Sequence, residues 1–138
     1  MHAPDLTNLG KFYIGGRWVD PISADHMPVL NPATEEQVGT VSLGNRDDVN
    51  RAATAANEAF QSNAQTSKDD RLSLLKAVKA ITEKRLEDLA QAMRIEMGAP
   101  ISLAQTAQAG AGYGHLRQTI KTLETFDFVS QVTKKDGV

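Results

Sequence analysis

The hydrophobic period of this chain changes once, at Gly44, and the change divides it into a strand-forming part and a helix-forming part. Before Gly44, short β-favouring runs at residues 12–19, 26–30 and 37–43 are separated by turn residues. After Gly44, apolar residues recur every three or four positions as far as residue 126. This order predicts an α+β fold, in which two short antiparallel β pairs are followed by three helices.

Glycine and proline place the turns of the strand part. Gly15 and Gly16 favour a two-residue hairpin turn, because both tolerate the positive φ that such a turn requires. Asn31 and Pro32 favour a turn over residues 31–36 between the second pair of strands. Residues 1–10 carry no periodic pattern and are expected to form a flexible arm, which leaves residues 11–138 as one incomplete domain.

Caps and stops place the helices. Asn45 is expected to cap the first helix, Ser67 to cap a second over residues 68–97, and Gly98 to end that second helix. A third helix is expected from about residue 102 to 126, and residues 128–132 then have β character. A thirty-residue helix is about 45 Å long, whereas a compact domain of this length has a radius of gyration of about 14 Å. We therefore expect the chain to lack part of its packing partner.

Composition excludes several classes of function. The 138 residues are 41% hydrophobic and 23% charged, and the net charge of −2 gives no reason to expect nucleic acid or an anionic membrane as partner. No apolar run approaches the ~20 residues that cross a bilayer, and no signal-peptide pattern opens the chain. Zero cysteines exclude disulfides, thiolate catalysis and cysteine-bound zinc. The expected location is the cytoplasm.

Few residues suggest chemistry by themselves. A phosphate loop at Gly110, Gly112 and Gly114 would need a strand before it, so close approach of another backbone to a glycine-lined helix is the expected alternative. The three histidines are far apart in sequence and lack ligand spacing, and no Gly-x-Ser-x-Gly elbow for a serine nucleophile occurs. Catalytic residues are therefore not expected in this chain.

Six segments in register resemble the N-terminal part of aldehyde dehydrogenases. They are Tyr-Ile-Gly-Gly-Arg-Trp at residues 13–18, Leu-Asn-Pro-Ala-Thr at 30–34, Val-Gly-Thr-Val at 38–41, Asp-Asp-Val at 47–49 leading to Ala-Phe at 59–60, Arg-Leu-x-Leu-Leu at 71–75, and Glu-Met-Gly-Ala-Pro at 96–100. Each is common alone, but the six together span more than a hundred residues. The resemblance implies part of the α/β cofactor-binding domain of such an enzyme.

The resemblance also implies an activity for the full-length protein. Enzymes of this family oxidise an aldehyde to a carboxylic acid with NAD or NADP, using a cysteine thiolate that adds to the aldehyde and a glutamate-activated water that releases the acid. Their catalytic and main cofactor-binding residues come later than this chain reaches. We therefore expect the chain alone to be inactive and to bind no cofactor, and the full-length enzyme to act on a small aldehyde as a homo-oligomer.

Two minor sites are implied within the chain. In many relatives, an acidic residue before the Gly-x-Pro stop and a carbonyl near the Asn-Pro turn bind a monovalent cation, and these positions match Glu96 and Leu30. The alternative is a solvated glutamate at a helix end. The third helix of relatives borders the aldehyde channel, and the matching face includes Ala107 and Ala111 at i, i+4. Their small size equally suits close packing.

Other hypotheses remain open from the sequence. Relatives usually carry lysine at Ala99 and tryptophan near Asn63, and these departures leave the substrate undefined. A stand-alone binding or regulatory module could use the same scaffold. An unrelated helical interaction protein would need all six matches to be coincidental.

Overall fold

The computed structural model describes residues 7–131, and its elements follow the predicted order. Strands β1 (Phe12–Ile14) and β2 (Arg17–Val19) form one antiparallel pair, and β3 (His26–Leu30) and β4 (Gln37–Ser42) form another. The helices are α1 (Arg46–Asn63), α2 (Lys68–Lys84), α3 (Leu86–Met97), α4 (Ile101–Leu103), the π-helical turn η1 (Ala104–Gln108) and α5 (Ala109–Thr125).

Both strand pairs have the predicted turns. Gly15 and Gly16 adopt φ of 60° and 77°, so the first pair closes through the expected two-residue turn. Its register pairs Tyr13 with Trp18, whose rings meet edge to face at 5.2 Å on one side of the hairpin. In the second turn, the Asn31 carbonyl accepts from Glu35 N–H at 2.7 Å, and Glu35 itself has a φ of 61°.

Helix α1 is fixed to the preceding loop by the buried carboxylate of Asp48. The Asn45 side chain caps the helix, and Asp48 Oδ2 accepts from Asn45 N–H at 3.2 Å to complete a capping box. Asp48 also reaches 26 residues back, where Oδ1 accepts from Ile22 N–H at 2.9 Å. Asp48 therefore connects the helix start to the loop after β2, a role that the sequence does not reveal.

The predicted single helix over residues 68–97 is wrong, because the chain breaks at Arg85. Ser67 caps α2 as predicted, but Arg85 has φ −111° and ψ 15° and ends that helix. Thr82 Oγ1 donates to the Val78 carbonyl one turn earlier, a bond that weakens helices. Arg85 Nε pairs with Asp88 at 3.0 Å, and α3 begins with acidic residues at its positive end. The break removes the long projecting helix.

The third predicted helix exists, with its irregular turn before the glycines. Helix α4 leads into η1 and then α5, which ends at Thr125. The irregular turn lies at residues 104–108, and Gly110, Gly112 and Gly114 after it are regularly helical. The predicted strand after Phe126 does not form: residues 126–131 are irregular, and Val132 lies outside the described residues.

The described part of the expected arm lies against β4. Ser42 Oγ donates to the Gly10 carbonyl at 2.9 Å, and Lys11 N–H donates to Asn8 O at 3.0 Å. Residues 7–10 therefore form a turn held by the second strand pair, while residues 1–6 of the arm lie outside the described range. Within residues 7–131, none of the helices combines the length and apolar composition that a membrane crossing requires.

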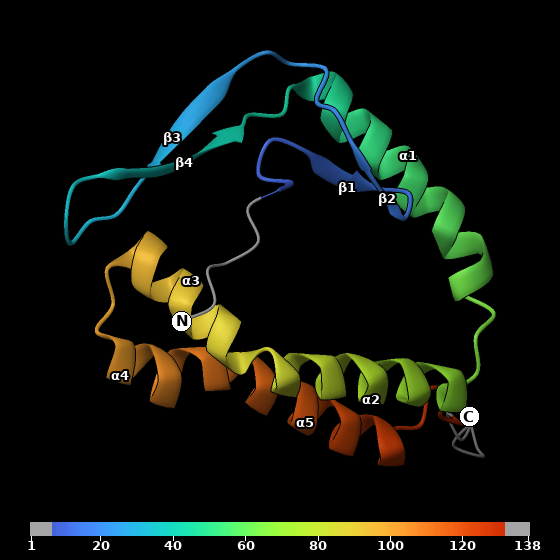
Figure 1. Ribbon diagram of the computed structural model, residues 1–138. Helices are drawn as coiled ribbons and strands as arrows, with labels where there is room; N and C mark the ends of the chain where they lie inside the picture. The colour runs from blue at the N-terminus through green and yellow to red at the C-terminus, as the bar shows by residue number, and fades with distance from the viewer. Residues whose placement is uncertain (1–6, 132–138) are drawn as a thin grey trace, which may run out of the picture.

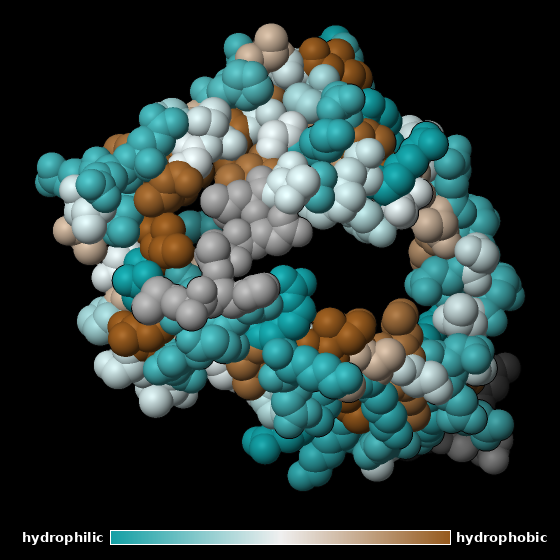
Figure 2. Space-filling view, viewed as in Figure 1, coloured by the Kyte–Doolittle hydropathy of each residue, from teal (hydrophilic) through white to brown (hydrophobic). Residues whose placement is uncertain are grey.

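The elements are arranged in a ring (Figure 1) around an opening that the space-filling view also shows (Figure 2), and they bury little core. Helices α2 and α5 lie side by side, and the hairpins and α1 form the other side of the opening. The core is small: Ala90, Ala99, Ala104 and Ala109 form one cluster with neighbouring Leu86, Met93 and Ile101, and Leu72 and Ile120 are buried apart from it. No large side chain is fully buried among the described residues.

Several apolar faces are exposed instead of packed. Helix α2 exposes Leu74, Val78 and Ile81 at i, i+4 and i+7, each by at least 40%. Figure 2 shows hydrophobic surface over α2 beside the opening. On α1, Val49 and Phe60 of the predicted apolar face are about 60% exposed. The expectation of incomplete packing agrees with these exposures.

Asp48→Asn should destabilise the chain at neutral pH. Burial of the Asp48 carboxyl raises its pKa, but N–H donors of Ile22, Asn45 and Ser23, with Arg51, together hold that pKa below the ordinary 3.8. The ionised form therefore stabilises the fold above about pH 4, and this contribution is lost as pH falls through the lowered pKa. Urea unfolding should show a lower midpoint for Asp48→Asn at pH 7 and a shrinking difference in acid. Equal midpoints for Asp48→Asn and the control Asp47→Asn at pH 7 would contradict this role.

Two glycine substitutions should change stability in opposite directions. Gly98 has a φ of 65°, and an added Cβ would lie 2.8 Å from Pro32 Cγ. Gly98→Ala should therefore destabilise the chain by at least about 1–2 kcal/mol, the cost of the left-handed conformation alone. Gly112→Ala meets nothing within 4 Å and lies inside α5, so it should stabilise by up to about 1 kcal/mol. Paired urea titrations measure both, and the same sign for both variants would refute the assignment.

Candidate functional site

The end of α3 packs against the Asn-Pro turn and brings two of the six motif segments together. Gly98 takes the left-handed conformation that ends the helix, as its sequence predicts. Its Cα faces the turn, because a Cβ built there would lie 2.8 Å from Pro32 Cγ and 3.3 Å from Ala33 N. Segments more than sixty residues apart in sequence therefore lie side by side.

Leu30 and Glu96 flank this contact. Leu30 is the last residue of β3, and Glu96 lies in the last turn of α3 with an exposed side chain. The final carbonyls of a helix lack intrahelical partners and form the negative end of its dipole. One carboxylate with main-chain carbonyls suits a weakly charged cation that takes oxygen ligands.

A site for a more highly charged metal is absent from the described part of the chain. No group of three or more histidine, aspartate or glutamate side chains is placed to hold an ion there. His26 lies beside Ser42, with 3.3 Å between Nδ1 and Oγ, and His115 lies on α5.

The Ser42–His26 pair is unsuited to nucleophilic catalysis. Ser42 is buried, and its Oγ donates to the Gly10 carbonyl at 2.9 Å. A hydroxyl that already donates its proton to a carbonyl cannot also donate it to the imidazole as a base-activated nucleophile does. The pair connects the start of the chain to the second strand pair.

Ala107 and Ala111 both expose their side chains. Ala107 lies in η1 and Ala111 lies in α5. The buried alanine Ala104 precedes both in sequence, and the buried Ala109 lies between them. Ala107 lies inside the π-helical turn, where Ala109 N–H donates to the Ala104 carbonyl. The two residues nevertheless both lie outside the small core.

The glycines of α5 do not receive another backbone. Built Cβ atoms at Gly110, Gly112 and Gly114 meet nothing within 4 Å, so the expected close approach is wrong for the described residues. A phosphate loop is excluded as well, because the glycines lie inside a helix that follows no strand. The glycines instead leave a strip of helix backbone uncovered.

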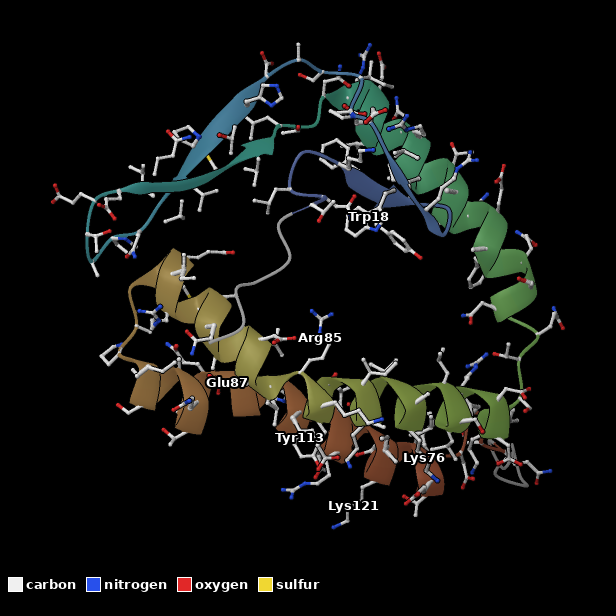
Figure 3. The ribbon with its side chains drawn as sticks, viewed as in Figure 1. Trp18, Lys76, Arg85, Glu87, Tyr113 and Lys121 are labelled. Atoms are coloured by element: carbon white, nitrogen blue, oxygen red, sulfur yellow. The ribbon has the colours of Figure 1, made fainter. Side chains whose placement is uncertain are left out.

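Polar pairs around the Arg85 break join the helices, and the sequence does not indicate them (Figure 3). Glu87 accepts from Gln91 at 2.7 Å and from Gln105 of η1 at 2.9 Å, and these bonds lower the pKa of Glu87. Tyr113 of α5 donates to Glu83 of α2 at 3.2 Å. These contacts fix α5 and η1 against α2 and α3.

Lys79 completes the contact between α2 and α5. Its ammonium lies 4.8 Å from the centroid of the Tyr113 ring. The Tyr113 hydroxyl, with Glu83 adding its charge, raises the pKa of Lys79, so the lysine stays protonated. This cluster positions helices, since every member already has a partner within the chain.

Comparison with known proteins identifies the family. A sequence profile described as "Aldehyde dehydrogenase family" matches residues 18–137. The 3-succinoylsemialdehyde-pyridine dehydrogenase of a Pseudomonas species is 45% identical over 119 residues, which cover 86% of this chain and 25% of that protein. A putative aldehyde dehydrogenase of Staphylococcus saprophyticus is 37% identical over 123 residues, covering 89% and 26%.

Solved structures agree with this match. Aldehyde dehydrogenase C of Pseudomonas syringae, a mutant in complex with NAD+ and octanal, superposes with a TM-score of 0.92 at 38% identity, covering 96% of this chain and 27% of that one. An aldehyde dehydrogenase of Bartonella henselae gives a TM-score of 0.88 at 38% identity, covering 92% and 27%.

The chain spans about a quarter of the length of the relatives that it matches. The profile covers most of its residues, and the described strands and helices superpose on those of the solved relatives. The family and the fold predicted from the six motif segments are confirmed. The chain belongs to the aldehyde dehydrogenase family.

Proposed function

We propose that this chain is one part of an NAD- or NADP-dependent dehydrogenase that oxidises an aldehyde to a carboxylic acid. The observation that carries the proposal is the match to the family over residues 18–137. The named Pseudomonas relative is a semialdehyde dehydrogenase, and the Pseudomonas syringae enzyme was solved with NAD+ and an aldehyde.

The chain would supply scaffold and positioning to such an enzyme, while the reacting groups would come from elsewhere. It contains no cysteine, so the family's thiolate nucleophile cannot come from it. The nicotinamide cofactor accepts hydride in this chemistry, and the residues that hold it would lie in the three-quarters of the relatives' length outside this match. We therefore propose that the chain alone is inactive and binds no cofactor.

Two positions in this chain would assist the complete enzyme. Glu96 and the Leu30 carbonyl would bind a monovalent cation, a proposal supported by the packing of the α3 end on the Asn-Pro turn. Ala107 and Ala111 would border the aldehyde channel, which their exposed positions outside the core support. Short side chains there leave room for a bulky aldehyde.

Cytoplasmic location remains a proposal from the sequence. Homo-oligomerisation is proposed from the apolar side chains on α1 and α2 that the fold leaves exposed. Apolar patches that a chain cannot cover favour contact with other copies.

A chimera tests the enzymatic proposal. Replacing the matching quarter of the 45% identical Pseudomonas dehydrogenase with this chain should retain NAD(P)-dependent oxidation of that enzyme's aldehyde, measured as NAD(P)H formation. The chain alone should form none. A folded chimera without activity, or activity of the isolated chain, would contradict the proposal.

Variants of the same chimera separate the two minor positions. Glu96→Gln should increase the potassium concentration needed for full activity, with Glu58→Gln as an exposed control on α1. Ala111→Phe should lower kcat/KM for bulky aldehydes about tenfold, the effect of about 1.4 kcal/mol, and spare the smallest aldehydes. Uniform loss for all aldehydes would indicate a packing role for Ala111.

Self-association of the isolated chain is measurable by light scattering. We expect the mean mass to exceed 14.9 kDa and to rise with concentration. Leu74→Ser and Ile81→Ser on α2 should reduce this rise, because both side chains are about 60% exposed. A concentration-independent monomer would count against the proposal.

A further inference from the structure

A crevice between the tip of the first hairpin and the middle of α1 has the features of a ligand site. Its volume is about 450 Å³, within the range of small-molecule pockets. The face of the hairpin turned toward α1 supplies Ile14, Arg17 and Val19, and Figure 3 shows Trp18 on the side of the open centre. The other wall is a stripe of α1 that consists of Arg51, Thr54, Ala55 and Glu58.

Arg51 lines this crevice with part of its guanidinium unpaired. Its Nη2 donates to the Asp20 carbonyl at 2.9 Å and lies 3.4 Å from Asp48 Oδ1. The Asp48 carboxylate also accepts from three backbone N–H groups, so its charge is shared among several donors. Arg51 Nε is buried and has no acceptor within the described part of the chain, and an unpaired buried donor is unfavourable.

Arg17 adds a second guanidinium. Its side chain is exposed and makes no hydrogen bond or ion pair with any described residue. A guanidinium presents several donors in a planar fork that matches a carboxylate. The crevice therefore contains two cationic groups from two elements and an uncovered apolar floor of Ile14, Val19 and Ala55.

Glu58 is the one acidic residue among those that line the crevice, and its carboxylate repels an anionic ligand. The lining residues Arg17, Arg51 and Glu58 together carry a formal charge of +1, and Asp48 beside Arg51 brings the local sum to zero. The two guanidinium groups therefore attract one carboxylate through their hydrogen-bond donors and not through net charge. Glu58 is seven residues from Arg51 on α1, or about 10 Å along the helix axis. That separation along the helix weakens its repulsion of an anion beside Arg51.

We propose that this crevice binds a small organic monocarboxylate. The carboxylate would accept hydrogen bonds from Arg51 and Arg17, and the carbon chain would cover Ile14, Val19 and Ala55. The apolar floor favours an organic acid over inorganic phosphate, whose surface is entirely polar. The site is built from this chain's own residues and does not depend on its activity in a larger enzyme.

Amide NMR of the whole chain tests the site with hexanoate as the probe. The amide signals of Gly15, Gly16 and Ala55 should shift with hexanoate until the site is saturated. Added salt should raise the hexanoate concentration that is needed for saturation. Arg17→Gln and Arg51→Gln should each raise the dissociation constant about tenfold, and Arg17→Lys should recover part of the loss. Arg46→Gln, on α1 but outside the crevice, serves as the matched control.

Several outcomes would overturn the site. Shifts that never saturate, or that Arg46→Gln reduces as much as Arg17→Gln does, would show non-specific attraction. Inorganic phosphate that binds as tightly as hexanoate would refute the assignment to organic acids. If Arg51→Gln unfolds the chain through the loss of its bond to Asp20, the exposed Arg17 decides the question alone.

Discussion

The contact of Gly98 with Pro32 joins the two halves of this structure. On one side of the open centre, the halves are connected covalently, through the segment between α1 and α2. On the other side, they meet where the end of α3 packs on the turn between β3 and β4. The contact needs a residue without a side chain in the left-handed conformation. The positions of Leu30 and Glu96, and with them the proposed cation site, follow from this one glycine.

Local chemistry predicts many of the elements, and tertiary contacts decide the others. Gly15 and Gly16, the Ser67 cap and the Gly98 stop act within a few residues, so the sequence alone predicts their structures. The break at Arg85 depends on partners that pack on both sides of it, and apolar spacing continues across it without interruption. The long-range bonds of Asp48, and the bond of Arg51 to Asp20 beside the crevice, join residues 25–31 positions apart, which a local pattern cannot indicate.

Exposure of apolar side chains connects the fold to the family match. Periodicity correctly identifies apolar faces on α1 and α2, yet these faces remain uncovered by the described residues. Apolar faces favour contact with a further surface, because such burial is the dominant favourable term in folding and in most association. The solved relatives are about four times as long as the part that this chain matches. Polar pairs such as Glu83 with Tyr113 then hold helices together where a large core is lacking.

The π-helical turn η1 affects how residues 104–125 align with the corresponding helix of related proteins. Such a turn accommodates one residue more than an α-helical turn does. Removing one residue from 104–108 would restore regular helix and leave the residues after it in the same register, because the wide turn absorbs the extra residue. Tyr113 would then keep its bond to Glu83, and Ile120 would stay buried. A relative with an uninterrupted helix here should therefore align with this chain through a one-residue gap within 104–108, and the gap marks an inherited insertion instead of a shift in the core.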